Sequence, residues 1–486
     1  MEQFKNLESS KVFDFFHEMS QIPRESKKEE KISNYLKKFA EDRNLWVEQD
    51  GENNIIIKKE ATASMKSAPT VILQAHMDMV CEKGKDSTHN FDEDPIEWVI
   101  KDDYIYANDT TLGADNGIGA CFALALLDSS DIEHPALEVV VTTDEETGMT
   151  GANFLDTSIL DGKIFINIDS EEEGLFFLSC AGGNDTRISI PVNFEMVQGE
   201  LIEVDVTGLL GGHSGMEIIK ERANASKVIG RYLNVLTDND IDFNLVEVHG
   251  GSKMNAITRD AHAKIVVNDG NLAKMEELAE QLRHDLKAEY TPQDPDATIN
   301  ITKKDVGEFN AMSLESSLRV VAGLVLVPFG PQSFSQVMDN LVQTSSNIGV
   351  VETTDSSVEF LSGLRSSVTS QKQELVEVHN VIARLIGADI KHGSFYPAWP
   401  LDPNSRIKEV FLDTYKDLFN EDATVEAIHA GLECGIFKEK MGEDVDFISF
   451  GPNMYDVHTA EEHVSISSID KNWKFFKKML ANLNNY

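Results

Sequence analysis

Three short segments in the first third of the chain consist almost entirely of apolar residues. They span residues 70–75, 137–143 and 163–168, and each is rich in valine, isoleucine or phenylalanine. A fourth segment, 117–127, carries apolar residues at helical spacing and lies between the first two. Continuous apolar strands that alternate with helices are typical of a sheet covered by helices on both faces. The pattern therefore predicts an α/β fold for this part of the chain.

The pattern changes after about residue 186. Alternating strands and amphipathic helices follow one another there, as is typical of an α+β domain. The strands include 203–207 and 263–267, and the helices include 223–235, 274–288 and 371–386. A proline-rich stretch, 396–404, then leads into helix and strand patterns at 407–419, 446–450 and 470–483. We therefore predict an α/β domain in two parts, 1–185 and 396–486, interrupted by a large inserted α+β domain, 186–395.

Charge and composition exclude several classes of protein. The chain has 43 Lys and Arg residues against 83 Asp and Glu residues, a formal net charge of -40. Such a surface repels nucleic acid and anionic membranes, so neither is expected as a partner. No apolar run approaches the ~20 residues that span a bilayer, and the first residues do not resemble a secretory signal. The 4 cysteines form no CxxC pair, and we expect a cytoplasmic protein.

Histidine and carboxylate residues follow directly on the three apolar strands. His76 and Asp78 come after the first strand, Glu145 and Glu146 after the second, and Asp169 after the third. Ligands of open α/β sheets bind outside the carboxyl ends of the strands. The sequence therefore predicts that these side chains meet at one edge of the sheet.

Two further residues extend this group. Asp115 stands in a Gly-Ala-Asp-Asn-Gly stretch before a helix, and His458 follows the last predicted strand. Taken singly, each pattern also fits a structural role, such as a helix N-cap or a solvated loop. Together they offer nitrogen and oxygen ligands without cysteine, which suit zinc, cobalt or manganese in a hydrolytic site. A carboxylate such as that of Asp115 can bridge two cations about 3.5–4 Å apart.

The ordered motifs resemble the M20 family of metallopeptidases, and within it the aminoacyl-histidine (Xaa-His) dipeptidase branch. The similarity covers essentially the whole chain. The matching stretches are QAHMDMVCEK, DTTLGADNGIGA, TGLLGGHSG, GGSKMNAI and AIHAGLECGIF. The resemblance implies a di-metal catalytic domain with a mixed sheet covered by helices, and it identifies the inserted α+β domain as a lid.

The resemblance also implies a pair of divalent metal ions, of which Zn²⁺ fits best and Co²⁺ or Mn²⁺ are alternatives. One ion would be bound by His76, Asp115 and Asp169. The other would be bound by Asp115, Glu146 and His458, so that Asp115 bridges the pair. The peptide bond between Asp115 and Asn116 is expected to be cis.

The remaining roles implied by the resemblance are catalytic or substrate-binding. Glu145 matches the general base, and Asp78 matches the residue that orients the imidazole of His76. His213 would stabilise the oxyanion, while Asn255 and Arg365 would hold the substrate, Arg365 through the peptide's terminal carboxylate.

The expected activity is hydrolysis of Xaa-His and other dipeptides, including β-alanyl-histidine, by a water that bridges the two metal ions. Another di-metal amidohydrolase of the same family, such as a tripeptidase or a deacetylase, is the alternative. A non-catalytic metal-binding scaffold would be expected to lack Glu145 or a metal ligand, and all are present. Small dipeptides are thus the expected partners, and we expect a homodimer.

Overall fold

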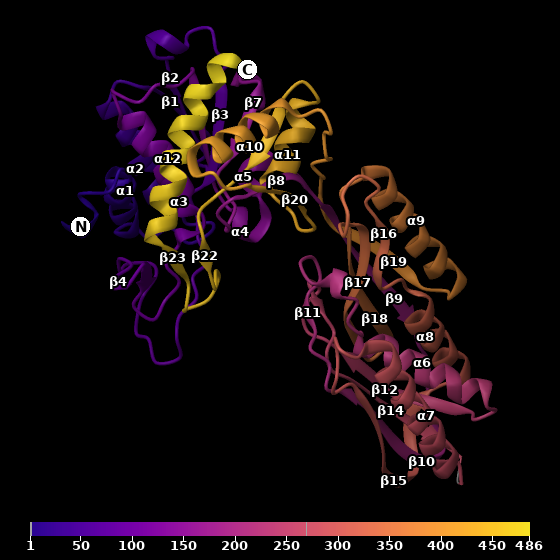
Figure 1. The fold of residues 1–486 in the computed structure, drawn as a ribbon. Helices are drawn as coiled ribbons and strands as arrows, with labels where there is room; N and C mark the ends of the chain where they lie inside the picture. Colours follow the sequence, from indigo (N-terminus) through magenta and orange to yellow (C-terminus); the bar gives the residue numbers. More distant parts are fainter. Residues whose placement is uncertain (1, 269) are drawn as a thin grey trace. The chain divides into compact units, whose positions relative to one another are not determined.

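The computed structural model describes residues 2–268 and 270–486, which form two compact units (Figure 1). The α/β unit combines the segments Met1–Ser179, Leu401–Ala427 and Leu432–Tyr486. The inserted unit combines Cys180–Pro400 and Ile428–Gly431. The inserted unit thus extends a few residues beyond the predicted insert at both ends, and it takes four residues from the later part of the chain.

The α/β unit is built on an eight-stranded mixed sheet with the strand order β1-β2-β6-β3-β7-β21-β8-β20. Strands β6, β3 and β7 are parallel neighbours, whereas β2 pairs with β6 in the antiparallel sense. The eight strands are β1 (Trp46–Gln49), β2 (Ile55–Lys59), β3 (Val71–His76), β6 (Leu137–Thr142), β7 (Ile164–Asn167), β8 (Leu175–Cys180), β20 (Thr424–Ile428) and β21 (Asp446–Ser449). The three apolar strands of the sequence are therefore adjacent, and the predicted mixed α/β fold is confirmed.

Every residue of β3 and β6 is buried, which shows that both faces of these central strands are covered. A strand with both faces buried needs apolar residues at successive positions rather than at alternate ones. The helices of this unit are α1 (Ser10–Ser20), α2 (Glu30–Asp42), α3 (Ala114–Asp128), α4 (Glu145–Gly148), α5 (Thr150–Phe154), α10 (Arg406–Phe419), α11 (Glu433–Met441) and α12 (Ile466–Asn482). Aromatic rings of α3 and α12 pack together, with Phe122 stacked on Phe476 at 6.0 Å between centroids.

A small four-stranded sheet, β22-β23-β5-β4, adjoins this fold within the same unit. Its strands are β4 (Trp98–Lys101), β5 (Tyr104–Ala107), β22 (Met454–Tyr455) and β23 (His463–Ser465). The side chain of Ser465 caps α12 by accepting a hydrogen bond from the backbone N–H of Ser468. This cap explains why the helix predicted for 470–483 begins earlier, at Ile466.

The inserted unit contains a nine-stranded sheet with the order β15-β10-β14-β12-β17-β18-β9-β19, in which β16 also pairs with β17. A separate two-stranded sheet joins β11 and β13. The strands are β9 (Gly182–Pro191), β10 (Phe194–Thr207), β11 (Gly212–His213), β12 (Phe243–Gly250), β13 (Ala256–Ile257), β14 (Ala261–Val267), β15 (Thr298–Met312), β16 (Gly330–Phe334), β17 (Val342–Thr353), β18 (Ser357–Ser366) and β19 (Asp389–Tyr396).

Four helices lie along one face of the large sheet of the inserted unit (Figure 1). They are α6 (Ala225–Asp238), α7 (Leu272–Tyr290), α8 (Leu314–Leu326) and α9 (Thr369–Leu385). Residues that alternate along the strands, such as Val204 and Ala263, are buried beneath these helices. Their neighbours along the strands are polar and partly exposed, so the sheet has one apolar and one polar face.

Among the described residues, no helix combines the length and the apolar composition that crossing a membrane requires.

Candidate active site

The carboxyl ends of β3, β6 and β7 lie at the same edge of the sheet, because these strands are parallel neighbours. His76 is the last residue of β3, Glu145 and Glu146 begin α4 just after β6, and Asp169 follows β7. The side chains predicted to meet at this edge are in fact close together. His76 has ligand atoms within 4.8 Å of those of Glu145 and Glu146, and it also lies within this distance of Asp115 and Asp169.

His76 and His458 approach the two oxygens of one carboxylate. The Nε2 atom of His76 lies 3.1 Å from Oδ1 of Asp115 and 3.5 Å from Oδ1 of Asp169. The Nε2 atom of His458 lies 3.1 Å from Oδ2 of Asp115 and 3.0 Å from Glu146. Asp115 is therefore shared between two groups of three potential ligands.

The chemistry of these donors fits two divalent cations. Tetrahedral zinc ligands at about 2.0–2.1 Å from the metal lie about 3.3–3.4 Å from one another, close to the separations of 3.0–3.5 Å seen here. Burial raises the pKa of Asp169 to about 6, and the nearby Asp115 adds to that rise. Carboxylates gathered in a buried place are costly as charges unless cations compensate them. The residues present thus suit a metal pair.

The backbone around Asp115 is held in an irregular conformation at the start of α3. Asp115 and Asn116 have non-helical φ/ψ values, and the peptide bond between them is cis, as the resemblance implied. The buried carboxylate of Glu462 accepts backbone hydrogen bonds from Leu112, Gly113 and Ala114 at 2.7–3.0 Å. Glu462 therefore fixes the loop that presents Asp115.

Asp78 links the imidazole of His76 to the glutamate pair. Its fully buried carboxylate lies 3.2 Å from Nδ1 of His76. It also accepts hydrogen bonds from the backbone N–H groups of Glu145 and Glu146, at 3.1 and 3.3 Å, and from the hydroxyl of Ser26. One side chain thus orients a ring on β3 and the first turn of α4, which makes it a positioning residue.

Glu145 lies among other acids at the start of α4. Burial raises the pKa of its carboxyl well above the usual value, and the charges of Asp169, Glu146 and Glu433 contribute to the rise. Cations held beside it would oppose that shift, since opposite charge favours the ionised carboxylate.

The predicted lid residues belong to the inserted unit. The Nδ1 atom of His213 accepts hydrogen bonds from the backbone N–H groups of Gly215 and Met216 at 3.3 and 3.2 Å. Burial, together with the charge of Arg365, lowers the pKa of His213. Its neutral ring therefore carries the proton on Nε2, where it can be donated as a hydrogen bond.

Arg365 and Asn255 lie on different elements of the same unit. Arg365 is on β18 and donates a hydrogen bond to the hydroxyl of Tyr396 at 2.9 Å. Asn255 precedes β13, and its carbonyl accepts a hydrogen bond from the backbone N–H of Ser214, next to His213. Their roles toward a substrate remain predictions.

The sequence model of "Peptidase family M20/M25/M40" matches residues 72–482. The chain belongs to this peptidase family. It is 36% identical to the cytosol non-specific dipeptidase of Escherichia coli (strain K12), over 99% of each chain. The M20 assignment made from the motifs is therefore confirmed.

Solved structures of two peptidases share this fold. The aminoacylhistidine dipeptidase of Vibrio alginolyticus matches with a TM-score of 0.91 at 35% identity, covering 99% of both chains. The aminopeptidase PepT of Bacillus cereus matches with a TM-score of 0.57 at 15% identity, covering 98% of this chain and 99% of its own, and this likeness concerns the fold alone. The M20 chain described here thus resembles the Vibrio enzyme along its whole length.

Two buried glutamates beside the site were not predicted from the sequence. Glu433 accepts hydrogen bonds from Gln74 on β3 at 2.5 Å and from Thr142 on β6 at 2.7 Å. Burial raises its pKa to about 8. The polar Gln74 within an otherwise apolar strand was a signal for such a partner. Glu462 gave no comparable signal, since its partners are backbone N–H groups.

Proposed function

We propose that this M20 chain is a metal-dependent dipeptidase that hydrolyses Xaa-His and other dipeptides, including β-alanyl-histidine. The geometry of Asp115 supports this most directly, because its two carboxylate oxygens face two different imidazoles at 3.1 Å. The names of the E. coli and Vibrio relatives support the substrate class. The word "cytosol" in the former supports a cytoplasmic location. We keep the homodimer as part of the proposal.

In this proposal His76, Asp115 and Asp169 hold one cation, and Asp115, Glu146 and His458 hold the other. Zn²⁺ suits these ligands best, with Co²⁺ or Mn²⁺ as alternatives. When bound, such a pair would lower the pKa of a water and polarise the scissile carbonyl.

In the proposed reaction, side chains of the protein transfer the proton and hold the substrate. Glu145 accepts the proton of the attacking water and passes it to the leaving amine. Asp78 keeps the ring of His76 in place. The Nε2–H group of His213 donates to the developing oxyanion, and Arg365 and Asn255 hold the dipeptide, Arg365 through the terminal carboxylate.

A chelation experiment with a substrate panel tests this function. We expect the holoenzyme to hydrolyse dipeptides such as β-alanyl-histidine, to lose this activity on dialysis against a chelator, and to regain it when Zn²⁺, Co²⁺ or Mn²⁺ is added. Preferential cleavage of tripeptides or of N-acetylated amino acids would instead assign the chain to one of the alternative activities. Hydrolysis that survives complete removal of metal would contradict the proposal.

His213 provides a separate test of the oxyanion role. We expect His213→Ala to lower kcat by about 10²–10³-fold, the usual loss for an oxyanion donor, while the metal content stays at the wild-type value. The matched control is His284→Ala, which removes an exposed imidazole on α7 of the same unit. An unchanged kcat in His213→Ala would remove this residue from the mechanism.

A further inference from the structure

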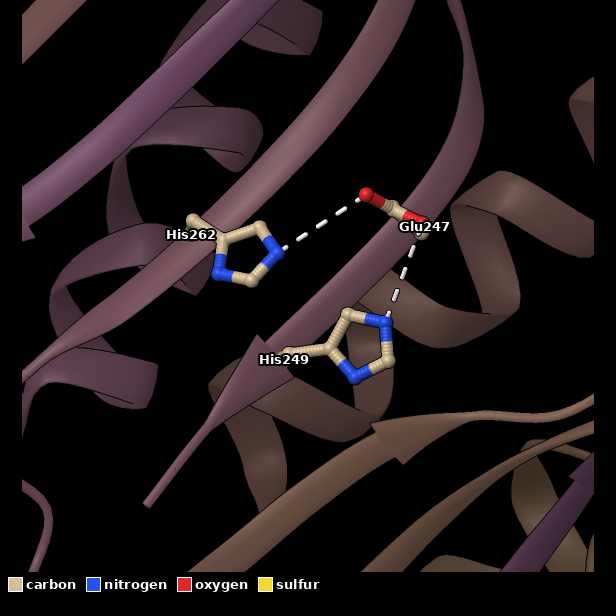
Figure 2. A group of neighbouring side chains, drawn as sticks. All are labelled: Glu247, His249 and His262. Carbon is tan, nitrogen blue, oxygen red and sulfur yellow. Dashed lines mark ion pairs between the residues drawn. The ribbon is translucent and has the colours of Figure 1, made fainter.

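A second group of potential metal ligands lies in the inserted unit, on residues to which the proposed reaction gives no role. Glu247 and His249 belong to β12, and His262 belongs to the neighbouring strand β14. The three side chains lie on the same face of these strands and point toward one another (Figure 2). Each offers a ligand atom within 4.8 Å of the other two.

Strand geometry explains why these side chains meet. Glu247 and His249 are two residues apart, so they project from the same face of β12. His249 is the direct cross-strand partner of His262, and side chains in such pairs are neighbours. The ring centroids of the two histidines are 5.1 Å apart. A register shift between Leu245 and Glu247 sets the pairing of the two strands at this point. The three side chains lie on the polar face of the sheet, opposite the helices.

The distances are near those of a metal site. The Nε2 atom of His249 lies 3.9 Å from Oε2 of Glu247, and the Nε2 atom of His262 lies 3.8 Å from Oε1 of the same carboxylate. Ligands of a tetrahedral zinc lie about 3.3–3.4 Å apart. Side-chain rotations would complete the geometry if they shortened these two separations by about half an ångström and also brought the two imidazole nitrogens, now within 4.8 Å of each other, to the same spacing. These are changes in χ angles and leave the strands in place.

Around the three side chains, the carboxylates of Glu203, Asp205 and Glu247 outnumber the ammonium groups of Lys264 and Lys304. Asp205 on β10 is the cross-strand partner of His262, and Glu203 is the partner of Lys264.

Lys264 is the competing cation at this place. Its ammonium lies 2.7 Å from Oε1 of Glu247, and it is also attracted by Glu203 and Asp205. The side chain is about one-third exposed, so it can keep one oxygen of Glu247 or turn toward Asp205, whereas Glu203 is already paired with Lys304. Among the described residues, the ion pairs of both imidazoles are with Glu247 alone.

We propose that His249, His262 and Glu247 form an additional Zn²⁺ site that links β12 to β14, separate from the two-cation centre of the α/β unit. Two imidazoles and one carboxylate leave a fourth position for water or for the nearby Asp205. Imidazole and carboxylate ligands without thiolate suit borderline divalent metals. Among these metals, Zn²⁺ is the ion that tests the site.

Counting bound zinc in matched variants of the full chain tests this site. We expect the His249→Gln/His262→Gln double variant to bind one Zn²⁺ fewer per chain than the wild type, in equilibrium dialysis with free Zn²⁺ buffered in the low micromolar range. The control variant His284→Gln should bind as much zinc as the wild type. Because the readout is a difference between variants, it does not depend on how many ions the α/β unit holds.

A second variant keeps the test independent of any effect of the double substitution on folding. Glu247→Gln retains both imidazoles and removes only the charged ligand, and we expect it also to lose one Zn²⁺. Equal zinc content in the wild type and in either of these variants would overturn the site. Dipeptide hydrolysis, measured on the same samples, reports on the proposed function separately.

Discussion

Glu145→Ala is expected to lower kcat for dipeptide hydrolysis by about 10²–10⁴-fold, the usual contribution of a general base, while both metal ions stay bound. That loss corresponds to about 3–5 kcal/mol of transition-state stabilisation. Glu145 stands at the edge of the sheet where the proposed ligands meet, yet the proposal gives it no metal to hold. Metal analysis and steady-state kinetics on the same preparation check both halves of this expectation.

The adjacent residue provides the matched control. Glu146→Ala removes a carboxylate of the same length from the next position of α4, and its oxygen lies 3.0 Å from Nε2 of His458. We expect this variant to lose one metal ion as well as activity. If Glu145→Ala also lost an ion, Glu145 would have to be reassigned as a ligand.

Asp115→Ala is expected to abolish binding of both cations and, with it, measurable turnover. Asp115 is the one proposed ligand shared by the two groups, with each oxygen 3.1 Å from a different imidazole. The fold should survive, because Glu462 holds the surrounding loop through backbone N–H groups that the substitution leaves in place. Metal content, together with circular dichroism, measures these two expectations.

Asp169→Ala is the control for this second prediction. Asp169 approaches only His76 of the two imidazoles, at 3.5 Å, so its loss should release one ion and leave the other. Full metal content in Asp115→Ala would contradict the shared-ligand arrangement, and with it the proposed centre.

The sequence was sufficient for the central sheet and for the edge where its acids meet. Strands β3, β6 and β7 could be recognised because burial on both faces requires unbroken apolar runs, and the residues that end such runs must lie together when the strands are parallel. Asp115 and His458 could be predicted as metal ligands only from the complete set of motifs. His458 lies in a loop after β22 and has a φ of +63°, a conformation that periodicity does not reveal.

The sequence was less informative about long polar strands and about buried acids. The prediction for 203–207 captured only the end of β10, which begins at Phe194. The whole strand pairs with β15, but only the later half also pairs with β14, and residues of the earlier half such as Glu195 and Met196 are exposed. Their pattern therefore carries no alternation between buried and exposed positions. Glu433 and Glu462 were missed because their partners are distant in sequence and come together only in the folded chain.

The order of strands in the α/β sheet has a consequence for synthesis on the ribosome. Strand β21 lies between β7 and β8, although it is made only at Asp446–Ser449, after the whole inserted unit. Until then β7 and β8 lack their shared neighbour, whereas the inserted unit is complete once Gly431 has emerged. Since domains fold as units while the chain grows from its N-terminus, we expect the inserted unit to reach its native state first and the α/β sheet to close last.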